Sequence, residues 1–545
     1  MSRINPYLLL GLFSLLLFLP GISNLPVVER DEAHFAQATR QMVQTGEYFQ
    51  IRFQDKTRFQ KPPGINWLQA AFVQLFSDGE QAKIWPYRLP SVIGALLSVW
   101  LTFFFSRRFV HERTALLASA FLASSLLLVV ETHMAVIDAS LLSSVVLMQG
   151  ALWIIYSNGI NRKSVHWGWA CIFWLAMAYG FVLKGVTPLV GVLSVAALCL
   201  FERRLDWLRG LRIFFGLCLF LVLSLAWLLL VNAAEQSNYL LQMVHKDLLP
   251  KLQGGHESHG KPPLFHLVVL PFTFWPASLF LWQGAVYAYK ERHQKTVRFL
   301  IAWILPTWIF FEMMPTKLPQ YVLPTFPAIA LLFALVVEQV KEKPGKWLHS
   351  LQFLWGVLTV GLAAGLLIMP YLLLQPLTLI NVLLFLVICG IGIACVFFAW
   401  KGAYFKASVF VLLTALMTFP FTFSVFLPQL NPLWLSYNVA QVVNKVDISD
   451  ESPLLVVGFS EPGLVFYLNT KKVLFTDAET AMGKMKCHGN HLLLINERDL
   501  ASIAEKMPLT ILQHIDGYNY SKGKWVKLLL VKKKCKQTLG RVINL

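Results

Sequence analysis

The chain has 545 residues, of which 56% are hydrophobic and 14% are charged, and its formal net charge is +18. This apolar content excludes a soluble multidomain protein and predicts a polytopic membrane protein. The 47 Lys and Arg residues stand in short clusters between apolar runs, which is typical of cytoplasmic loops. We therefore expect contact with membrane lipids and no binding of nucleic acid.

Apolar runs long enough to cross a hydrocarbon core of roughly 30 Å recur along the chain and predict about thirteen membrane-spanning helices. The first run follows Arg3 and has no small-residue cleavage site, so we interpret it as a retained span. The expected spans are 7–22, 88–106, 114–132, 139–157, 167–183, 185–201, 213–232, 265–287, 299–312, 322–340, 348–370, 379–400 and 407–427.

Connections between the spans alternate between short basic loops and polar segments. The basic loops are expected in the cytoplasm together with the N-terminus. The opposite face then receives a first outer loop at 23–87, a possible lid loop at 233–264 and everything after residue 427. We therefore predict a transmembrane domain at 1–427 and a soluble periplasmic domain at 428–545.

The last stretch differs in pattern from the spans. Short apolar segments at 454–458, 472–475 and 525–531 predict strands, and 501–507 predicts part of a helix, so a small α/β domain is expected. Cys487 and Cys535 fall in this domain, where an oxidising compartment permits a disulfide, and the sequence leaves that pairing open.

The first outer loop carries the densest charge in the first half of the chain. Asp31 is expected to begin a surface helix that ends at Gly46, followed by a hairpin over 48–59 and a second interfacial helix over 66–76. Asp31 and Glu32 can deprotonate an acceptor or stabilise an electron-poor sugar carbon. The alternative is that Asp31 only caps the helix and Glu32 supports it. Lys61 can bind a phosphate as a point charge.

Two ionisable residues stand at outer junctions between spans. Asp138 has no cationic neighbour in the sequence, so it is either a functional acid or a satisfied turn residue. Lys184 precedes a glycine and lies near a proline between two spans. It can bind an anion there or extend its ammonium group to the lipid headgroups.

Two later outer segments are also polar. The segment 254–263 contains His256, His259 and Lys261, which can form a metal site or a mobile lid, although the histidine spacing does not match a zinc helix motif. Lys317 opens a proline-rich segment that also holds Tyr321. These two residues can contact a phosphate, or the prolines alone can kink a helix.

Five of these features stand in an order that occurs in a known family. They are Asp31-Glu32, Phe59-Gln60-Lys61-Pro62-Pro63, Asp138, Lys184-Gly185 and Lys317-Leu318-Pro319 with Tyr321 and Pro324. In these motifs, over residues 5–340, the chain resembles the bacterial aminoarabinose transferases of lipid A, within the protein O-mannosyltransferase superfamily. The resemblance implies an α-helical GT-C type fold in a bacterial inner membrane.

The resemblance also implies an activity and roles for the site residues. The enzyme would move a sugar from an undecaprenyl-phosphate-type carrier to lipid A or another lipopolysaccharide acceptor on the periplasmic face. Asp31 would be the catalytic carboxylate with Glu32 as its neighbour, and Asp138 would be the second acid. The residues expected at the carrier phosphate are Lys61, Lys184, Lys261, Lys317 and Tyr321.

One position departs from the family pattern and bears on cofactors. Aminoarabinose transferases usually have Glu before the lysine of the KPP motif, where it can help a histidine of a later outer loop hold a structural metal. This chain has Gln60, a poorer ligand, while His256 and His259 remain. We expect no required cofactor, with a structural divalent metal as the open alternative.

Other functions are weighed against a glycosyltransferase. A transporter usually places charges near the membrane midplane and shows an internal repeat, whereas here the charges gather at one face. A membrane scaffold leaves Asp138 unexplained. The chain contains no G-x-G-x-x-G or Walker motif, which argues against direct use of a nucleotide sugar. The sequence does not name the sugar, and a protein O-mannosyltransferase-like activity is the alternative within the enzymes.

Overall fold

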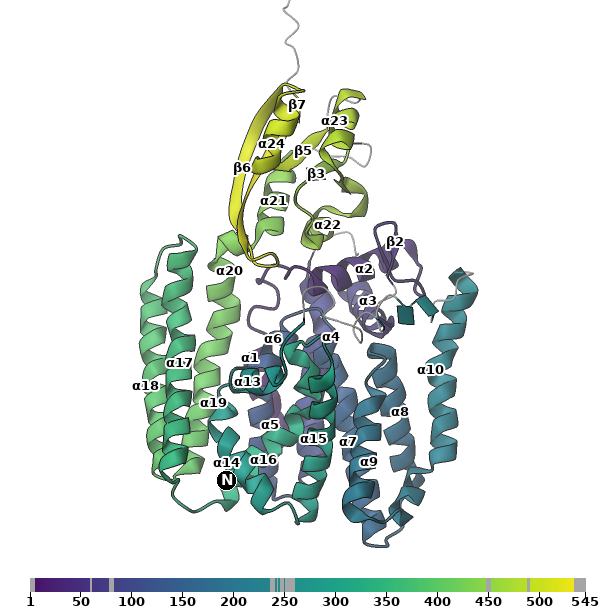
Figure 1. Ribbon diagram of the computed structural model, residues 1–545, viewed down its shortest axis with the longest axis vertical. Helices are drawn as coiled ribbons and strands as arrows, with labels where there is room; N and C mark the ends of the chain where they lie inside the picture. The colour runs from purple at the N-terminus through teal and green to yellow at the C-terminus, as the bar shows by residue number, and fades with distance from the viewer. Residues whose placement is uncertain are drawn as a thin grey trace, which may run out of the picture.

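The computed structural model describes residues 5–58, 61–77, 83–235, 260–446, 452–487 and 491–533, together with 241, 242, 244, 245 and 249. A broad layer of helices forms the lower part of the molecule, and a small domain of sheet and helices stands on one end of it (Figure 1). We call this the domain end of the bundle, and the other end the loop end.

The bundle is built from apolar helices that lie along the expected spans, although the described part of the chain has fewer full-length spans than the thirteen predicted. Among the described residues, eight helices are long and apolar enough to cross a membrane, or nine when one bent pair counts as a single span. The helices are α1 (Pro6–Phe18), α4 (Trp85–Ser106), α5 (Glu112–Ala123), α6 (Leu126–Thr132), α7 (Asp138–Ile160), α8 (Trp167–Leu183), α9 (Pro188–Glu202), α10 (Ile213–Glu235), α13 (Phe265–Thr273), α14 (Leu281–Lys290), α15 (Lys295–Met313), α16 (Phe326–Gln339), α17 (Lys346–Leu372), α18 (Leu379–Trp400) and α19 (Tyr404–Phe421), with short helices η1 (Asp206–Leu211), η4 (Ala277–Phe280), η5 (Pro319–Thr325), η6 (Thr422–Phe426), α20 (Leu427–Gln429) and η7 (Asn431–Leu433).

Two expected spans are interrupted. The span 114–132 is made of α5 and α6, which meet at a bend of 59°. The span 265–287 is split into α13, η4 and α14. Pro276 lies at the second break, and a proline there has no N–H to continue a helical ladder. The lengths of the apolar runs located both segments but did not predict these breaks.

The first outer loop folds as predicted. Helix α2 (Asp31–Thr45) begins at Asp31, and Gly46 ends it in a left-handed conformation with φ 73°. Strands β1 (Arg52–Phe53) and β2 (Lys56–Thr57) pair antiparallel as a hairpin, and α3 (Gly64–Phe76) follows. Helices α2 and α3 lie between the bundle and the C-terminal domain (Figure 1).

The C-terminal domain is a mixed sheet with helices, as the predicted α/β pattern requires. Its five strands have the order β4-β3-β5-β7-β6, where β3 pairs parallel with both neighbours and β7 pairs antiparallel with both of its own. The elements are α21 (Leu435–Val443), β3 (Leu454–Val457), α22 (Pro462–Leu468), η8 (Thr470–Lys472), β4 (Val473–Phe475), α23 (Ala478–Cys487), β5 (Leu492–Asn496), α24 (Glu497–Ala504), β6 (Leu509–Asn519) and β7 (Lys524–Lys533).

The predicted disulfide stays a prediction, because Cys535 and the side chain of Cys487 lie outside the described residues.

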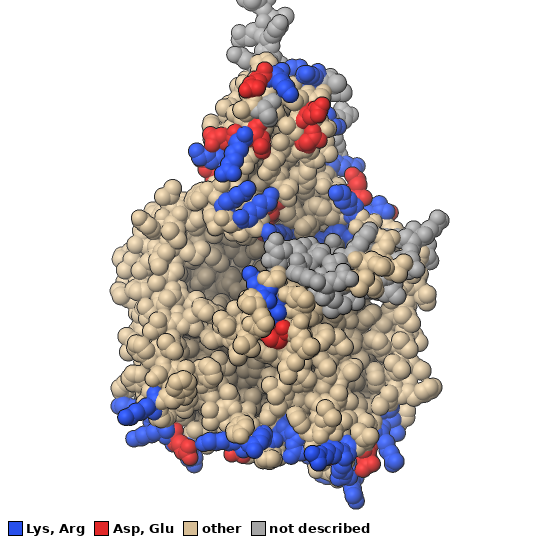
Figure 2. All heavy atoms as spheres, viewed as in Figure 1, with Lys and Arg blue, Asp and Glu red and all other residues tan. Residues whose placement is uncertain are grey.

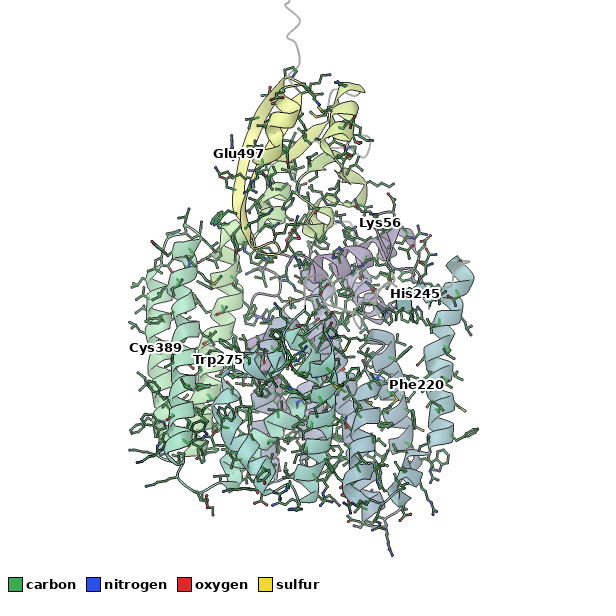
Figure 3. All side chains as sticks on the ribbon, viewed as in Figure 1. Lys56, Phe220, His245, Trp275, Cys389 and Glu497 are labelled. Atoms are coloured by element: carbon green, nitrogen blue, oxygen red, sulfur yellow. The ribbon has the colours of Figure 1, made fainter. Side chains whose placement is uncertain are left out.

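Side chains fill the bundle interior (Figure 3). Trp275, for example, is 2% exposed and donates from its indole nitrogen to Thr359 Oγ1 over 3.0 Å.

Charges are distributed unevenly over the surface. Figure 2 shows Lys and Arg side chains in a band along the loop end of the bundle, and a mixed set of charges on the C-terminal domain. The lateral surface between them is almost uncharged in this view. This pattern is what a bundle inserted in a bilayer requires.

Candidate active site

A buried ion pair fixes the first outer loop onto the bundle. Glu32 and Arg88 have fully buried side chains, and Arg88 Nε lies 2.7 Å from Glu32 Oε1. Glu32 also accepts the backbone N–H groups of Val28 and Ala135, both at 2.7 Å. Arg88 donates in addition to the carbonyls of the turn before α2, including Leu25 at 2.8 Å. Glu32 therefore joins the loop, α4 and the turn before α7, which gives it a positioning role.

Asp31 is left available by this arrangement. Its side chain is exposed, while the neighbouring Glu32 is buried. The N-cap of α2 is Arg30, at φ 67°, and α2 has no side-chain cap hydrogen bond. The interpretation of Asp31 as a helix cap therefore gains no support from the geometry, and Asp31 stays a candidate catalytic carboxylate.

Two of the predicted site residues meet directly. Lys184, at the end of α8, places Nζ 2.6 Å from Asp138 Oδ1, at the start of α7. The two side chains are only 12% and 11% exposed. Lys184 Nζ also lies 5.1 Å from the ring centroid of Tyr321, in η5. Residues that are 46 and 137 positions apart in the chain are thus brought to one place.

A third acid joins this cluster that the sequence analysis did not single out. Glu131, in α6, is 3% exposed, and its Oε2 has no hydrogen-bond partner in the part of the chain that the structure describes. Its carboxylate is close enough to interact electrostatically with Asp138, Lys184 and Asp31. Glu131 therefore lies within electrostatic range of both Asp31 and the Asp138–Lys184 pair. We call Asp31, Glu131, Asp138, Lys184 and Tyr321 the acid–lysine cluster.

The segment that carries Lys317 is fastened to the segment before α13. Gly260 and Thr316 form an antiparallel bridge, and the Lys261 N–H donates to the Pro315 carbonyl over 3.4 Å. Lys317 is 4% exposed and directs Nζ at the carbonyls of Met314, at 2.7 Å, and Lys261, at 3.2 Å. One of its three ammonium protons then remains for a phosphate.

Other predicted site residues can be placed only in part. Lys61 is half-buried just before α3, and Lys261 is exposed. Gln60, His256 and His259 lie outside the described residues. No group of three or more His, Cys, Asp or Glu residues suited to a metal occurs within the described ranges. The predicted divalent metal therefore stays a prediction.

The C-terminal domain closes over the first outer loop through buried polar contacts. Gly463 donates its N–H to Glu29 Oε2 over 2.9 Å, and the backbone N–H of Glu29 donates to the hydroxyl oxygen of Tyr520 over 2.7 Å. Arg40 in α2 donates to the Phe466 carbonyl over 2.6 Å. Burial, aided by the charge of Glu461, raises the pKa of Glu29 to about 7.

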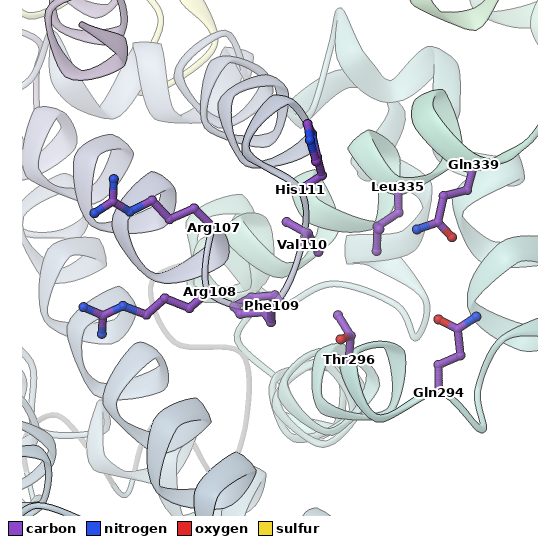
Figure 4. A pocket seen from close by; sticks show the side chains of 9 residues that line it. All are labelled: Arg107, Arg108, Phe109, Val110, His111, Gln294, Thr296, Leu335 and Gln339. Atoms are coloured by element: carbon purple, nitrogen blue, oxygen red, sulfur yellow. The ribbon is translucent and has the colours of Figure 1, made fainter.

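A cavity of about 440 Å³ lies at the loop end, where it is lined by the connection from α4 to α5 and by residues in or next to α15 and α16 (Figure 4). The side chains of Arg107 and Arg108 extend away from its centre in this view, and the guanidinium of Arg108 lies 4.2 Å from the ring centroid of Phe104. Its other lining residues include Gln294 and Gln339. Among the residues that the structure describes, no acidic side chain lines this cavity, and the two arginine side chains that line it extend away from its centre, so it is not the candidate site.

Sequence reasoning missed Arg88 and Glu131 for an identifiable reason. Each is one charged residue at the edge of an apolar run, where charges commonly only mark the membrane boundary. The signal that could have found them is the rule that an ionisable residue within such a run needs a named partner.

The fold and the cluster define a multi-pass membrane protein with a C-terminal mixed-sheet domain and a group of ionisable side chains at the end of the bundle that faces this domain. Residues 60–230 match the family described as dolichyl-phosphate-mannose-protein mannosyltransferase. The undecaprenyl phosphate-alpha-4-amino-4-deoxy-L-arabinose arabinosyl transferase of Pseudomonas paraeruginosa is 29% identical over 366 residues, which are 67% of this chain and 64% of that protein. The match thus spans slightly less than two thirds of the relative's length.

Solved structures agree with this relationship. The crystal structure of ArnT from Cupriavidus metallidurans in the apo state superposes on this chain with a TM-score of 0.74 at 17% sequence identity. The match covers 96% of this chain and 97% of the ArnT chain. The structure of the same protein bound to undecaprenyl phosphate gives a TM-score of 0.73 at 16% identity. The chain is therefore similar in sequence to aminoarabinose transferases and has an ArnT-like fold, as the resemblance in the sequence motifs predicted.

Proposed function

We propose that this chain is an integral membrane glycosyltransferase that moves a sugar from an undecaprenyl-phosphate-type carrier to lipid A or another lipopolysaccharide acceptor. The reaction takes place on the periplasmic face of a bacterial inner membrane. The transmembrane domain at 1–427 carries the chemistry, and the domain at 428–545 covers the first outer loop.

The observation that carries this proposal is the acid–lysine cluster at the domain end. Acids and a lysine from α2, α6, α7 and the α8–α9 junction gather there, and the 2.6 Å Asp138–Lys184 pair stands against the ring of Tyr321. A cationic group beside aromatic and acidic side chains at the membrane boundary suits a lipid-linked phosphate and its sugar. Relatives of similar sequence and fold are named for this carrier.

The chemistry assigns tasks to four members of the cluster, namely Asp31, Asp138, Lys184 and Tyr321. An acceptor oxygen attacks the anomeric carbon, its proton passes to Asp31, and the bond from that carbon to the carrier phosphate oxygen breaks with its electron pair. Lys184, oriented by Asp138, stabilises the charge of the departing phosphate, with Lys61, Lys261, Lys317 and Tyr321 assisting. Glu32 holds the loop that presents Asp31. No required cofactor is proposed, and any divalent metal would have a structural role.

A second acceptor class has one observation in its favour. The matched family is described by its transfer of mannose to protein, and the match covers residues 60–230, which include Lys61, Asp138 and Lys184. A hydroxyl of a Ser or Thr side chain is therefore the alternative acceptor. The cluster suits either acceptor, because both offer an oxygen nucleophile.

Purified full-length protein in lipid nanodiscs tests this function. It is mixed with synthetic polyprenyl-phosphate sugars carrying aminoarabinose, galacturonic acid or mannose, with lipid A or a Ser/Thr peptide as acceptor, and products are weighed by mass spectrometry. A sugar adduct on lipid A that Asp31→Asn abolishes supports the proposal. An adduct on the peptide alone supports the alternative acceptor. Solute uptake into proteoliposomes without any adduct contradicts both and favours a transporter.

A further inference from the structure

A buried histidine and glutamate that the proposed chemistry does not use stand beside the segment that carries Lys317 and Tyr321. His266, in α13, is 0% exposed, and its Nδ1 lies 2.7 Å from Glu312 Oε2, near the end of α15. Its Nε2 lies 3.1 Å from the backbone carbonyl of Leu318. Each ring nitrogen thus faces one oxygen atom and has one hydrogen-bond partner. The ring therefore joins the carboxyl group of Glu312 in α15 to the backbone just before η5.

The carbonyl held by this pair lies in the segment that carries two predicted phosphate-binding residues. Leu318 directly follows Lys317 and stands three positions before Tyr321. Tyr321 in turn faces Lys184, with 5.1 Å between Nζ and the ring centroid. A shift of the Leu318 peptide would therefore move both the Lys317 ammonium and the Tyr321 ring.

A purely structural role explains this pair poorly. Burying two polar side chains costs free energy that their hydrogen bonds must offset, and apolar side chains of similar size commonly pack as well. The second oxygen of Glu312, Oε1, is buried without a hydrogen-bond partner among the described residues. The pair thus keeps two polar side chains and an open acceptor at a position where α13, α15 and the segment before η5 meet.

We propose that the His266–Glu312 pair is a positioning device for the carrier phosphate: it clamps the Leu318 carbonyl and so sets Lys317 and Tyr321 against Lys184. The inference rests on the proposed function, because it assumes that these residues meet the phosphate of a lipid-linked donor. His266 and Glu312 are positioning residues, since they act on the phosphate through Lys317 and Tyr321.

The chain offers a matched control on the same helix. Arg298, near the start of α15, pairs with Glu202 of α9 at 2.5 Å, at the loop end of the bundle. Glu202→Gln and Glu312→Gln therefore each neutralise one acid of an ion pair made by α15, at opposite ends. A general loss of helix packing affects both variants, whereas loss of positioning affects only Glu312→Gln.

The test measures binding of a synthetic polyprenyl phosphate and transfer kinetics in nanodiscs. Glu312→Gln and His266→Gln are expected to raise the Kd of the polyprenyl phosphate and the KM of its sugar donor about tenfold with little change in kcat, since each loses a charge-assisted hydrogen bond that orders the segment. Glu202→Gln should change either constant less than about twofold. Amide hydrogen exchange at 314–321 should be faster in Glu312→Gln than in the unsubstituted protein. Glu312→Gln retains the shape of the side chain, so it still tests the proposal if His266→Gln fails to fold.

The outcomes separate the two proposals. If the unsubstituted protein binds polyprenyl phosphate and both site variants bind it equally well, the positioning role is wrong while the proposed function stands. Equal weakening by Glu202→Gln also overturns the positioning role. If the unsubstituted protein binds no polyprenyl phosphate, the proposed function fails and the positioning role fails with it.

Discussion

The two ends of the bundle both contain ion pairs, yet these pairs differ in how completely their polar atoms are used. At the loop end, Glu202 Oε1 accepts from Arg298 and from the Tyr156 hydroxyl, both at 2.5 Å. At the domain end, Asp138 and Lys184 pair beside Glu131, whose Oε2 has no partner within the described residues. An ion pair whose buried oxygen has hydrogen-bond partners is explained by a structural role alone. An additional buried carboxyl group without a partner, beside a lysine that is already paired, indicates a site for a ligand.

The largest expected effect separates the two ends by activity. Asp31→Asn and Lys184→Met should each lower the rate of sugar transfer about 10²- to 10⁴-fold, because one removes the proposed base and the other the charge opposite the departing phosphate. Glu202→Gln should retain activity within about threefold at saturating donor. Initial rates with a polyprenyl-phosphate sugar check this. Similar losses in all three variants would remove the functional distinction between the ends.

The next effect concerns stability. Arg88→Met leaves the Glu32 carboxylate buried without its cation, and should lower the free energy of unfolding by about 3–5 kcal/mol. Arg204→Met at the loop end breaks the 3.3 Å contact with Asp206, in which both side chains are well exposed, and should cost less than about 1 kcal/mol. Thermal unfolding in detergent measures both variants. Equal melting of the two would show that the Glu32–Arg88 pair does not anchor the loop.

A smaller effect is expected from pH at the contact between the C-terminal domain and the first outer loop. The pKa of Glu29 rises from 4.5 to about 7 when the chain folds, because burial disfavours the charged carboxylate and Glu461 adds to this. The folded state therefore binds this proton more tightly, so the stabilisation is complete below pH 4.5 and is lost as the pH rises through about 7.

Hydrogen exchange at 461–468 should accordingly be slower at about pH 5 than at about pH 8, by up to tenfold after correction for the intrinsic rate. Glu29→Gln removes the titrating group and should make the corrected exchange independent of pH in this range. Unchanged pH dependence in Glu29→Gln would assign the effect to another group.

The smallest effect is expected at the loop-end cavity. Gln294→Ala and Gln339→Ala enlarge a space that lies far from the acid–lysine cluster, so transfer should change less than about twofold. The same assay of initial rates measures this. A tenfold loss in either variant would give the cavity a part in the reaction and weaken the contrast between the two ends.

Much of the fold could be predicted from local pattern. Asp31 begins α2 and Gly46 ends it as expected, because a charged first turn and a glycine that tolerates positive φ are local signals. The strand at 473–475 and the expected spans were also located by short-range patterning. The break between α13 and α14 was not predicted, since hydropathy averages over a proline that interrupts the helix.

The site was predictable only in part, because its residues pair across long stretches of chain. The motif order indicated Asp138 and Lys184 as separate candidates, and nothing in either motif predicted that they pair at 2.6 Å. Arg88 pairs with Glu32, which is 56 positions away in the sequence, and His266 pairs with Glu312, which is 46 positions away. Such pairs depend on how helices pack, which the periodicity of one helix does not encode.

The most direct test of the central claim is a double-mutant cycle between Asp138 and Lys184, measured on the rate of transfer from a polyprenyl-phosphate sugar. If Asp138 acts by orienting Lys184 in one site, Asp138→Asn combined with Lys184→Met should be about as slow as Lys184→Met alone. If the effects of the two substitutions simply multiply, the residues act independently, and the account of a single acid–lysine site is contradicted.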